Sequence, residues 1–114
     1  MEIRLEQLDG RAVCERCRLA DGPITRMRGL LGRRTLPRGE GLLLRPAGSI
    51  HTLFMRFAID AVFLDGEQRV VKVVAALRPW RAASARGARV VVELAAGEAE
   101  RRGVQTGDRL TWEG

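Results

Sequence analysis

The sequence predicts a mainly β fold, a sandwich or barrel of about seven short strands with one or two short helices. Two observations lead to this fold class. Turn signals containing Gly, Pro or Asp divide the chain at short intervals, and helical spacing of apolar residues occurs in only two places. The chain has 114 residues, of which 46% are hydrophobic. This length and composition suit one domain spanning residues 1–114.

The N-terminal part is expected to form a β-hairpin followed by a helix. Residues 2–6 alternate polar and apolar, as a half-buried strand does, and Asp9-Gly10 suits the tight turn before a returning strand at 11–19. A helix is expected to open at Pro23 and to end near Gly32. The apolar residues that recur at helical spacing in this segment are Ile24, Met27, Leu30 and Leu31.

The rest of the chain predicts short strands separated by turns. Strands are expected around residues 41–45, 50–55, 61–64, 70–77, 90–94 and 109–112. Asp65-Gly66 is a second hairpin signal, and residues 79–87 are expected to be a polar loop that carries Trp80. Residues 97–103 suit one or two helical turns, because acids come early and arginines late, as the helix dipole prefers.

Charge and hydropathy limit the partners. The N-terminus has no apolar core segment, so no signal peptide is expected, and the apolar runs are too short to cross a bilayer. We therefore expect a cytoplasmic protein with no membrane partner. The net charge is +6, and residues 22–39 and 68–92 contain basic residues but no acids. These stretches form either one anion-attracting face, with weak non-specific binding to polyanions, or two separate solvated faces, and the composition favours the second.

Residues 49–66 are the most informative stretch, because they hold the sole histidine, His51, and all three phenylalanines. Asp60 lies in this stretch among apolar residues, and a buried carboxylate is costly unless it is paired or hydrogen-bonded. Two roles remain open for it. Its carboxylate accepts backbone N–H groups at a turn between strands, or it is a site carboxylate beside Arg56 and His51. The residues alone favour the structural role.

Four segments carry a recognisable pattern: Arg-Gly-Leu-Leu-Gly-Arg at 28–33, Gly-Leu-Leu at 41–43, His-Thr-Leu-Phe-Met-Arg-Phe-Ala-Ile-Asp at 51–60, and Gly-Val-Gln-Thr-Gly-Asp at 103–108. In this order and spacing, over residues 19–110, they resemble the DUF192 family of small prokaryotic β-rich domains. Many members have a Phe-Trp-Met signature before the aspartate. Here His51 stands at the tryptophan position, which resembles a subgroup with a His-Thr-x-Phe-Met-Arg pattern. The resemblance implies a jelly-roll-like β architecture and no particular reaction.

These observations favour a non-enzymatic binding or accessory module for an anionic small molecule or peptide, because arginine forks bind carboxylate and phosphate groups in a bidentate manner. The expected binding residues are Arg28, His51, Arg56, Asp60 and Trp80. Two alternatives remain open. One is a hydrolase-like enzyme with His51 and Asp60 as acid–base groups, and the other is a nucleic-acid accessory protein bound by charge. A pocket containing both His51 and Asp60 would favour a ligand or enzyme site, whereas a flat basic face would favour nucleic acid.

The sequence offers little for catalysis or for a cofactor. A Ser-His-Asp hydrolase would need Ser49 or Ser84 beside His51, and neither serine lies in a nucleophile-elbow motif. Cys14 and Cys17 form a single Cys-x-x-Cys pair, whereas a structural zinc site usually has four N or S ligands, so no metal or cofactor is expected. In a regular strand the two cysteines point to opposite faces, and we expect two reduced thiols packed as small apolar groups.

Overall fold

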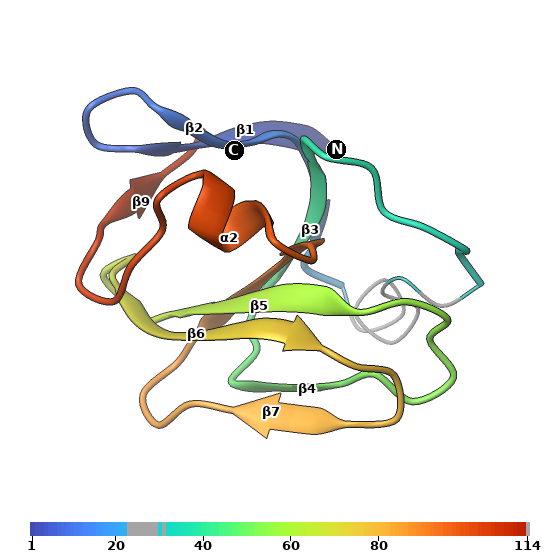
Figure 1. Ribbon diagram of the computed structural model, residues 1–114. Helices are drawn as coiled ribbons and strands as arrows, with labels where there is room; N and C mark the ends of the chain where they lie inside the picture. Colours follow the sequence, from blue (N-terminus) through green and yellow to red (C-terminus); the bar gives the residue numbers. More distant parts are fainter. Residues whose placement is uncertain (23–29, 31, 114) are drawn as a thin grey trace.

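The computed structural model describes residues 1–22, 30 and 32–113. The fold is mainly β, as the sequence predicts, and the described residues form nine strands and one short helix (Figure 1). The helix is α2 Glu98–Arg101, and no helix in the described part of the chain is long and apolar enough to cross a bilayer. Of the other expected helix, residues 23–29 and 31 lie outside the described residues. The strands are β1 Glu2–Gln7, β2 Ala12–Ala20, β3 Glu40–Leu44, β4 Ser49–His51, β5 Ile59–Leu64, β6 Val70–Leu77, β7 Ala82–Ser84, β8 Val90–Ala95 and β9 Leu110–Thr111.

Seven strands form one curled sheet in the order β6-β5-β8-β3-β2-β1-β9. Its pairs are antiparallel except for β2 and β3, which run parallel. The two outer strands, β6 and β9, lie close together at their N-terminal ends, where an isolated β-bridge joins Arg69 to Arg109. There Val70 N donates to Asp108 O at 2.7 Å, and Leu110 N donates to Gln68 O at 3.0 Å. The sheet therefore curls as a barrel does, and β4 and β7 form a separate two-stranded hairpin.

The two faces of the sheet bury two different cores. Along β5, Val62 and Leu64 belong to the first core, inside the curl, together with Ala99 of α2. Ile59, Ala61 and Phe63 alternate with them and belong to the second core, which also contains Ile50 of β4 and is covered by Ala83 of β7. In Figure 1, α2 lies above β5 and the β4–β7 hairpin lies below it. Because side chains alternate along a strand, every residue of β5 is buried, half of them on each face.

A bulge in β2 overturns the expectation for the two cysteines. Ile3 pairs with Cys17 and Leu5 pairs with Cys14, so two steps along β1 face three steps along β2. A bulge of this kind shifts the alternation of side chains by one residue. Glu15 and Arg16 are both exposed, and Cys14 and Cys17 are both fully buried in the first core. The prediction that the two cysteines point to opposite faces is therefore wrong.

Two other differences from the expected strands concern the β4–β7 hairpin. The strand expected at 50–55 ends at His51, because the chain turns at Thr52 and Phe54 adopts a φ of 66°. The polar loop expected at 79–87 contains β7, whose alanines and serine carry no strand signal of their own. Pairing with β4 makes β7 a strand, with Ser49 opposite Ser84.

Candidate functional site

Thr52 is fully buried and holds the loop after β4 against the loop before β7. Its hydroxyl donates to Arg78 O at 2.6 Å and accepts a hydrogen bond from Arg81 N at 2.8 Å. The backbone adds two more bonds, from Thr52 N to Arg81 O at 2.8 Å and from Trp80 N to Thr52 O at 2.9 Å. The two loops are therefore fixed side by side at one end of the hairpin.

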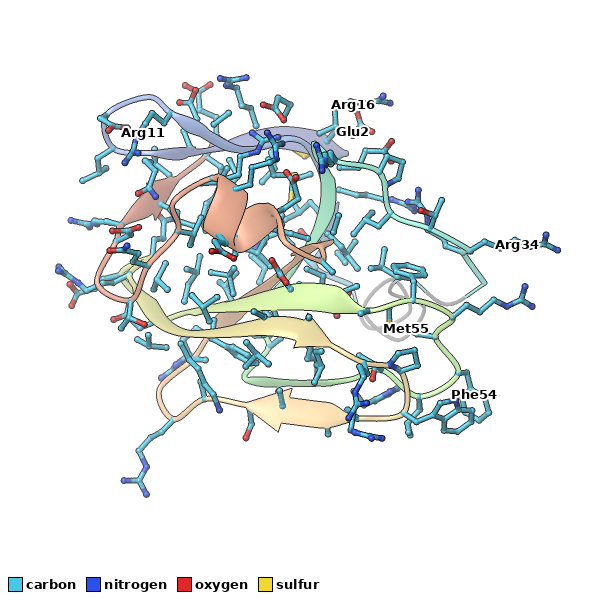
Figure 2. All side chains as sticks on the ribbon, viewed as in Figure 1. Glu2, Arg11, Arg16, Arg34, Phe54 and Met55 are labelled. Atoms are coloured by element: carbon cyan, nitrogen blue, oxygen red, sulfur yellow. The ribbon has the colours of Figure 1, made fainter. Side chains whose placement is uncertain are left out.

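An aromatic pair projects from these two loops. The rings of Phe54 and Trp80 meet edge to face with their centroids 4.7 Å apart, yet the two residues are 69% and 55% exposed. Both have a positive φ, 66° and 64°, which costs about 1–3 kcal/mol for such residues and persists only where the surroundings impose it. In Figure 2, Phe54 lies at the outer end of the loops. The Thr52 hydrogen bonds are what keep this strained arrangement in place.

His51 lies beside the loops, in a hollow of about 410 Å³ over the hairpin. Its Nδ1 accepts a hydrogen bond from Leu53 N at 3.3 Å, which leaves Nε2 as the donor atom. The hollow is lined by Ser49, Ile50, His51, Ala82, Ala83 and Ser84. This set contains no carboxylate, so the two serines near His51 have no acid to complete a triad there.

Asp60 lies on the opposite face of the sheet from His51. It alternates with Ala61 in β5, and its carboxylate points to the α2 side, where it is fully buried. One oxygen accepts a hydrogen bond from Ala76 N at 2.8 Å, and the other accepts from Gly97 N at 3.0 Å and Ala99 N at 2.9 Å. Asp60 therefore caps α2 and ties it to β6, and both of its oxygens are occupied by backbone donors.

The structure brings together only part of the expected binding set. His51 and Trp80 lie at the same end of the hairpin, and Arg56 follows in the loop after β4 with its side chain exposed. Asp60 is separated from them by the sheet. Arg28 lies outside the described residues.

Glu93 of β8 is a buried carboxylate that was not predicted as a site residue, and it is 4% exposed. It lies on the second-core face, paired in register with Leu42 of β3 and Ala61 of β5. Burial raises the pKa of its carboxyl group to about 7. No residue in the described part of the chain pairs with this carboxylate. Its signal in the sequence was a single acid inside an apolar strand.

Thr52, Phe54, Arg78 and Arg81 were not predicted as site residues either. Phe54 was assigned to a strand, so burial was expected for it. No residue pattern indicates that Thr52 will bind the other loop, because that loop lies about 26–29 residues further on in the sequence.

A second hollow, of about 430 Å³, lies at the opposite end of β5, beside the turn into β6. Trp112 lines it together with charged residues of both signs. These are Asp21, Arg45, Asp65 and Arg89. Because the charges are mixed, this hollow does not favour an anion.

The comparisons with known proteins agree with the fold. The model of the DUF192 family, described as "Uncharacterized ACR", matches residues 5–112. A UPF0127 protein of Pyrococcus furiosus is 38% identical over 109 residues, covering 90% of this chain and 91% of the relative. A UPF0127 protein of Pyrococcus horikoshii is 36% identical over 101 residues, covering 83% and 85%.

Two solved structures are also similar. A protein described as a putative transcription regulator, from Sinorhizobium meliloti, has a TM-score of 0.84 at 25% identity and covers 97% of this chain and 92% of its own. A protein of unknown function from Novosphingobium aromaticivorans has a TM-score of 0.83 at 23% identity, with 98% and 84% covered. The family match spans nearly the whole chain, and the motifs at 28–33, 41–43, 51–60 and 103–108 all fall inside it. This chain belongs to the DUF192 family, whose function is unknown.

Proposed function

We propose that the chain is a non-enzymatic binding module that recognises an acidic, partly apolar peptide segment of a partner protein. The recognising region is the loop-tip surface, defined as Leu53, Phe54, Arg56, Arg78, Trp80 and Arg81. The observation that carries the proposal is the exposed pair of Phe54 and Trp80, held outward by the hydrogen bonds of Thr52.

The aromatic pair suits protein recognition. Leu53, Phe54 and Trp80 together expose a large apolar area to water, and such patches are typical of interaction sites. Aromatic side chains dominate the binding energy of many interfaces because they bury much area with few rotatable bonds. Since both loops are already fixed by Thr52, little conformational entropy remains to be lost on binding.

The charges around the pair favour an acidic ligand. Residues 41–59 and 68–92 contain no acid. Arg56, Arg78 and Arg81 have exposed side chains, and none forms an ion pair with a described residue. Other arginines are paired, as Arg33 is with Glu40 and Arg38 with Glu98. Arg81 Nη1 donates to Trp80 O at 3.2 Å, but a guanidinium that has no carboxylate partner is available for a charge-assisted bond to a carboxylate of a ligand.

The hollow beside the surface favours an extended peptide over a compact small molecule. It runs over both strands of the hairpin, and its lining comes from all six residues of β4 and β7. Its exposed residues other than His51 are small, namely Ser49, Ala82 and Ser84. An extended chain can therefore lie close to the hairpin, with apolar side chains on the aromatic pair and acids near the arginines.

The enzyme alternative has less support. An acid–base mechanism with His51 and Asp60 needs both groups at one reacting centre, and these two residues lie on opposite faces of the sheet. Both oxygens of Asp60 are also engaged by backbone N–H groups. A binding role does not require Asp60 to reach the ligand.

The proposal is tested with fluorescein-labelled peptides of about ten residues, the scale of an extended recognition motif. In one set, glutamate alternates with leucine and serine, and in the matched set lysine replaces glutamate. Fluorescence anisotropy at near-physiological salt should show binding of the acidic set only. Phe54→Ala and Trp80→Ala should each weaken binding by about tenfold or more, as expected for central aromatic residues.

Leu8→Ala is the matched control, because Leu8 is 69% exposed, the same fraction as Phe54, and lies in the β1–β2 turn. It should leave binding unchanged. Equal binding of both peptide sets, or an equal loss in Leu8→Ala, would overturn the proposal. Because the similar Sinorhizobium protein is described as a putative transcription regulator, duplex DNA is a necessary competitor. Preferred binding of DNA would favour the nucleic-acid alternative, and Phe54-dependent binding to phosphatidylglycerol vesicles without peptide binding would assign the surface to membranes.

A further inference from the structure

The bulge in β2 turns a Cys-x-x-Cys sequence into a pair of adjacent thiols. Cys14 and Cys17 both lie in the first core with no exposed surface. Without the bulge, the spacing would place them on opposite faces of the strand. The extra residue, opposite the step from Ile3 to Leu5, is therefore what brings the two sulfur atoms to the same side.

The immediate surroundings hold Cys14 closely. Its thiol donates to Gly39 O at 3.4 Å. Gly41 of β3 packs against it so tightly that a Cβ atom there would lie 2.9 Å from the Cys14 sulfur. The Glu15–Arg102 ion pair, at 2.6 Å, joins this part of β2 to the chain after α2. The Cys14 thiol is thus enclosed by Gly41 of β3, the Gly39 carbonyl and the Glu15–Arg102 ion pair.

The two thiols are not equivalent. The pKa of the Cys14 thiol is lowered, chiefly by its interaction with the neighbouring Cys17 thiol and then by the backbone N–H of Arg16, while burial and the negative charge of Glu15 act in the opposite direction. The pKa of the Cys17 thiol is raised by its contact with Cys14 and by burial. Cys14 is therefore the first of the two to ionise, and the thiolate is the nucleophilic form of cysteine.

We propose that Cys14 and Cys17 form a redox-active dithiol, which small peroxides convert into an intramolecular disulfide. A nucleophilic thiol beside a resolving thiol is one feature of redox-sensing pairs, and because both thiols here are buried, their oxidation requires a local opening of the structure. A metal site is the less suitable interpretation, because the described residues contain no group of three or more potential His, Cys, Asp or Glu ligands. Neither cysteine belongs to the loop-tip surface, so the dithiol is independent of the peptide-binding proposal.

The reaction balances with hydrogen peroxide as the oxidant. The Cys14 sulfur attacks one peroxide oxygen, the O–O bond breaks, and the leaving hydroxide takes the Cys14 proton to form water. Cys14 is then a sulfenic acid. The Cys17 sulfur attacks the Cys14 sulfur, the S–O bond breaks, and the departing hydroxide takes the Cys17 proton to form a second water. Two thiols lose two electrons, and the peroxide gains them.

Burial gives the pair a size selectivity. Because neither sulfur is exposed, a reagent reaches it only when the structure opens locally. Hydrogen peroxide needs a smaller opening than a bulky aromatic disulfide reagent such as dithionitrobenzoate. The folded protein should therefore react with peroxide much faster than with dithionitrobenzoate, relative to the same chain unfolded in urea.

The test oxidises the wild-type protein with hydrogen peroxide, removes the peroxide with catalase, and alkylates the denatured chain before mass spectrometry. The expected product has lost about 2 Da and takes up no alkylating reagent. Dithiothreitol should restore two alkylatable thiols. Two thiols that persist after complete treatment, a sulfinic acid on one cysteine, or a disulfide between two chains would each overturn the proposal.

Two further measurements separate the roles of the thiols from a general effect of the fold. Cys17→Ser should stop at a sulfenic acid on Cys14 that dimedone traps, whereas Cys14→Ser should yield neither adduct nor disulfide at the same peroxide dose. In a glutathione redox buffer, the wild-type ratio of disulfide to dithiol should be about tenfold higher for the folded chain than in urea, because the folded chain holds the two thiols on the same side of β2 and so raises their effective concentration. This second measurement needs no variant. A lower ratio for the folded chain would mean that the native structure opposes the bridge, and the proposal would fail.

Discussion

The two faces of the curled sheet differ in the hydrogen bonds that they offer to a buried carboxylate. On the α2 face, Asp60 receives three backbone hydrogen bonds and ties a helix, a strand and a turn together. On the hairpin face, Glu93 is buried to a similar degree, and burial raises its pKa to about 7. Desolvation penalises both charges, but among the described residues only Asp60 finds donors that compensate for it.

The same contrast extends to the rest of each face. On the α2 face, the charges are paired. Arg102 binds Glu98 and Glu15 at 3.0 and 2.6 Å, and Arg101 binds Glu98 at 2.7 Å. At the hairpin, arginines and aromatic side chains are presented to solvent without such ion pairs to the residues that the structure describes. We infer that the α2 face serves stability and that the hairpin face is the one available for recognition.

Asp60→Ala gives the largest expected effect. It leaves three N–H groups without their acceptor, the buried one of Ala99 and the partly buried ones of Ala76 and Gly97, and it empties a fully buried site, so the free energy of unfolding should fall by about 3 kcal/mol. Urea denaturation measures the change. Asp65→Ala is the matched control, because Asp65 also accepts two backbone N–H bonds but is partly exposed, so water can replace it at smaller cost.

Asp60→Asn keeps one acceptor oxygen and should lie between the wild type and Asp60→Ala. Its binding of the acidic peptide should be unchanged if the two faces have separate roles. A wild-type denaturation midpoint for Asp60→Ala would show that the α2 face does not depend on this residue.

Glu93→Gln tests the other carboxylate through pH. In the unfolded chain the Glu93 carboxyl group loses its proton near pH 4.5, whereas in the folded protein it holds the proton up to about pH 7. The unfolded state therefore binds fewer protons in this range, and stability falls as pH rises from 4.5 to 7. The full loss of unfolding free energy from this one group is about 3 kcal/mol, because its pKa is 4.5 in the unfolded chain and about 7 in the folded protein.

Urea denaturation of the wild type and of Glu93→Gln at pH 4.5, 6 and 8 isolates the contribution of Glu93 to stability. The other titrating groups are the same in both proteins, so their effects cancel when the two unfolding free energies are subtracted. The variant should match the wild type at the lowest pH and be the more stable protein at the highest. A difference that does not change with pH would mean that Glu93 is solvated or paired in solution.

Thr52→Val has the smallest expected effect on stability and a clear effect on the site. Valine fills nearly the same space but removes the hydroxyl bonds to Arg78 and Arg81, at a cost of about 1–2 kcal/mol. The loops should loosen, Trp80 fluorescence should change, and peptide affinity should fall. Thr106→Val, at an exposed position, is the control that should change none of these. Unaltered peptide affinity in Thr52→Val would show that recognition by Phe54 and Trp80 does not depend on the hydrogen bonds of the Thr52 hydroxyl.

Local signals were sufficient for most of the strands, because alternation and turn residues act over a few positions. The hairpin at Asp9-Gly10 and the buried run of β5 are examples. The bulge in β2 could not be predicted from the local sequence, since it depends on how β1 pairs with Cys14 and Cys17. Strand β7 depends in the same way on β4, because its own residues have low strand propensity.

The candidate site was predictable only in its residue types. The stretch around His51 and the loop at Trp80 were identified, but their contact through Thr52 joins segments distant in the sequence. Asp60 was correctly expected to have a reason for its burial. Which face of β5 it occupies follows from the register with β6 and β8, and no local pattern specifies that register.

The pairing of β1 with both β2 and β9 also bears on how the protein is made. Glu6 lies opposite Thr111, so β1 leaves the ribosome long before its second partner does. Hairpins such as β1–β2 and β5–β6 can form while the chain is still being synthesised. The curled sheet cannot close until β9 is released, so its inner apolar surface stays accessible during the elongation of the strands between them. Contacts of such long sequence separation slow folding. The inner apolar surface of the emerging chain is therefore open to aggregation until the sheet closes.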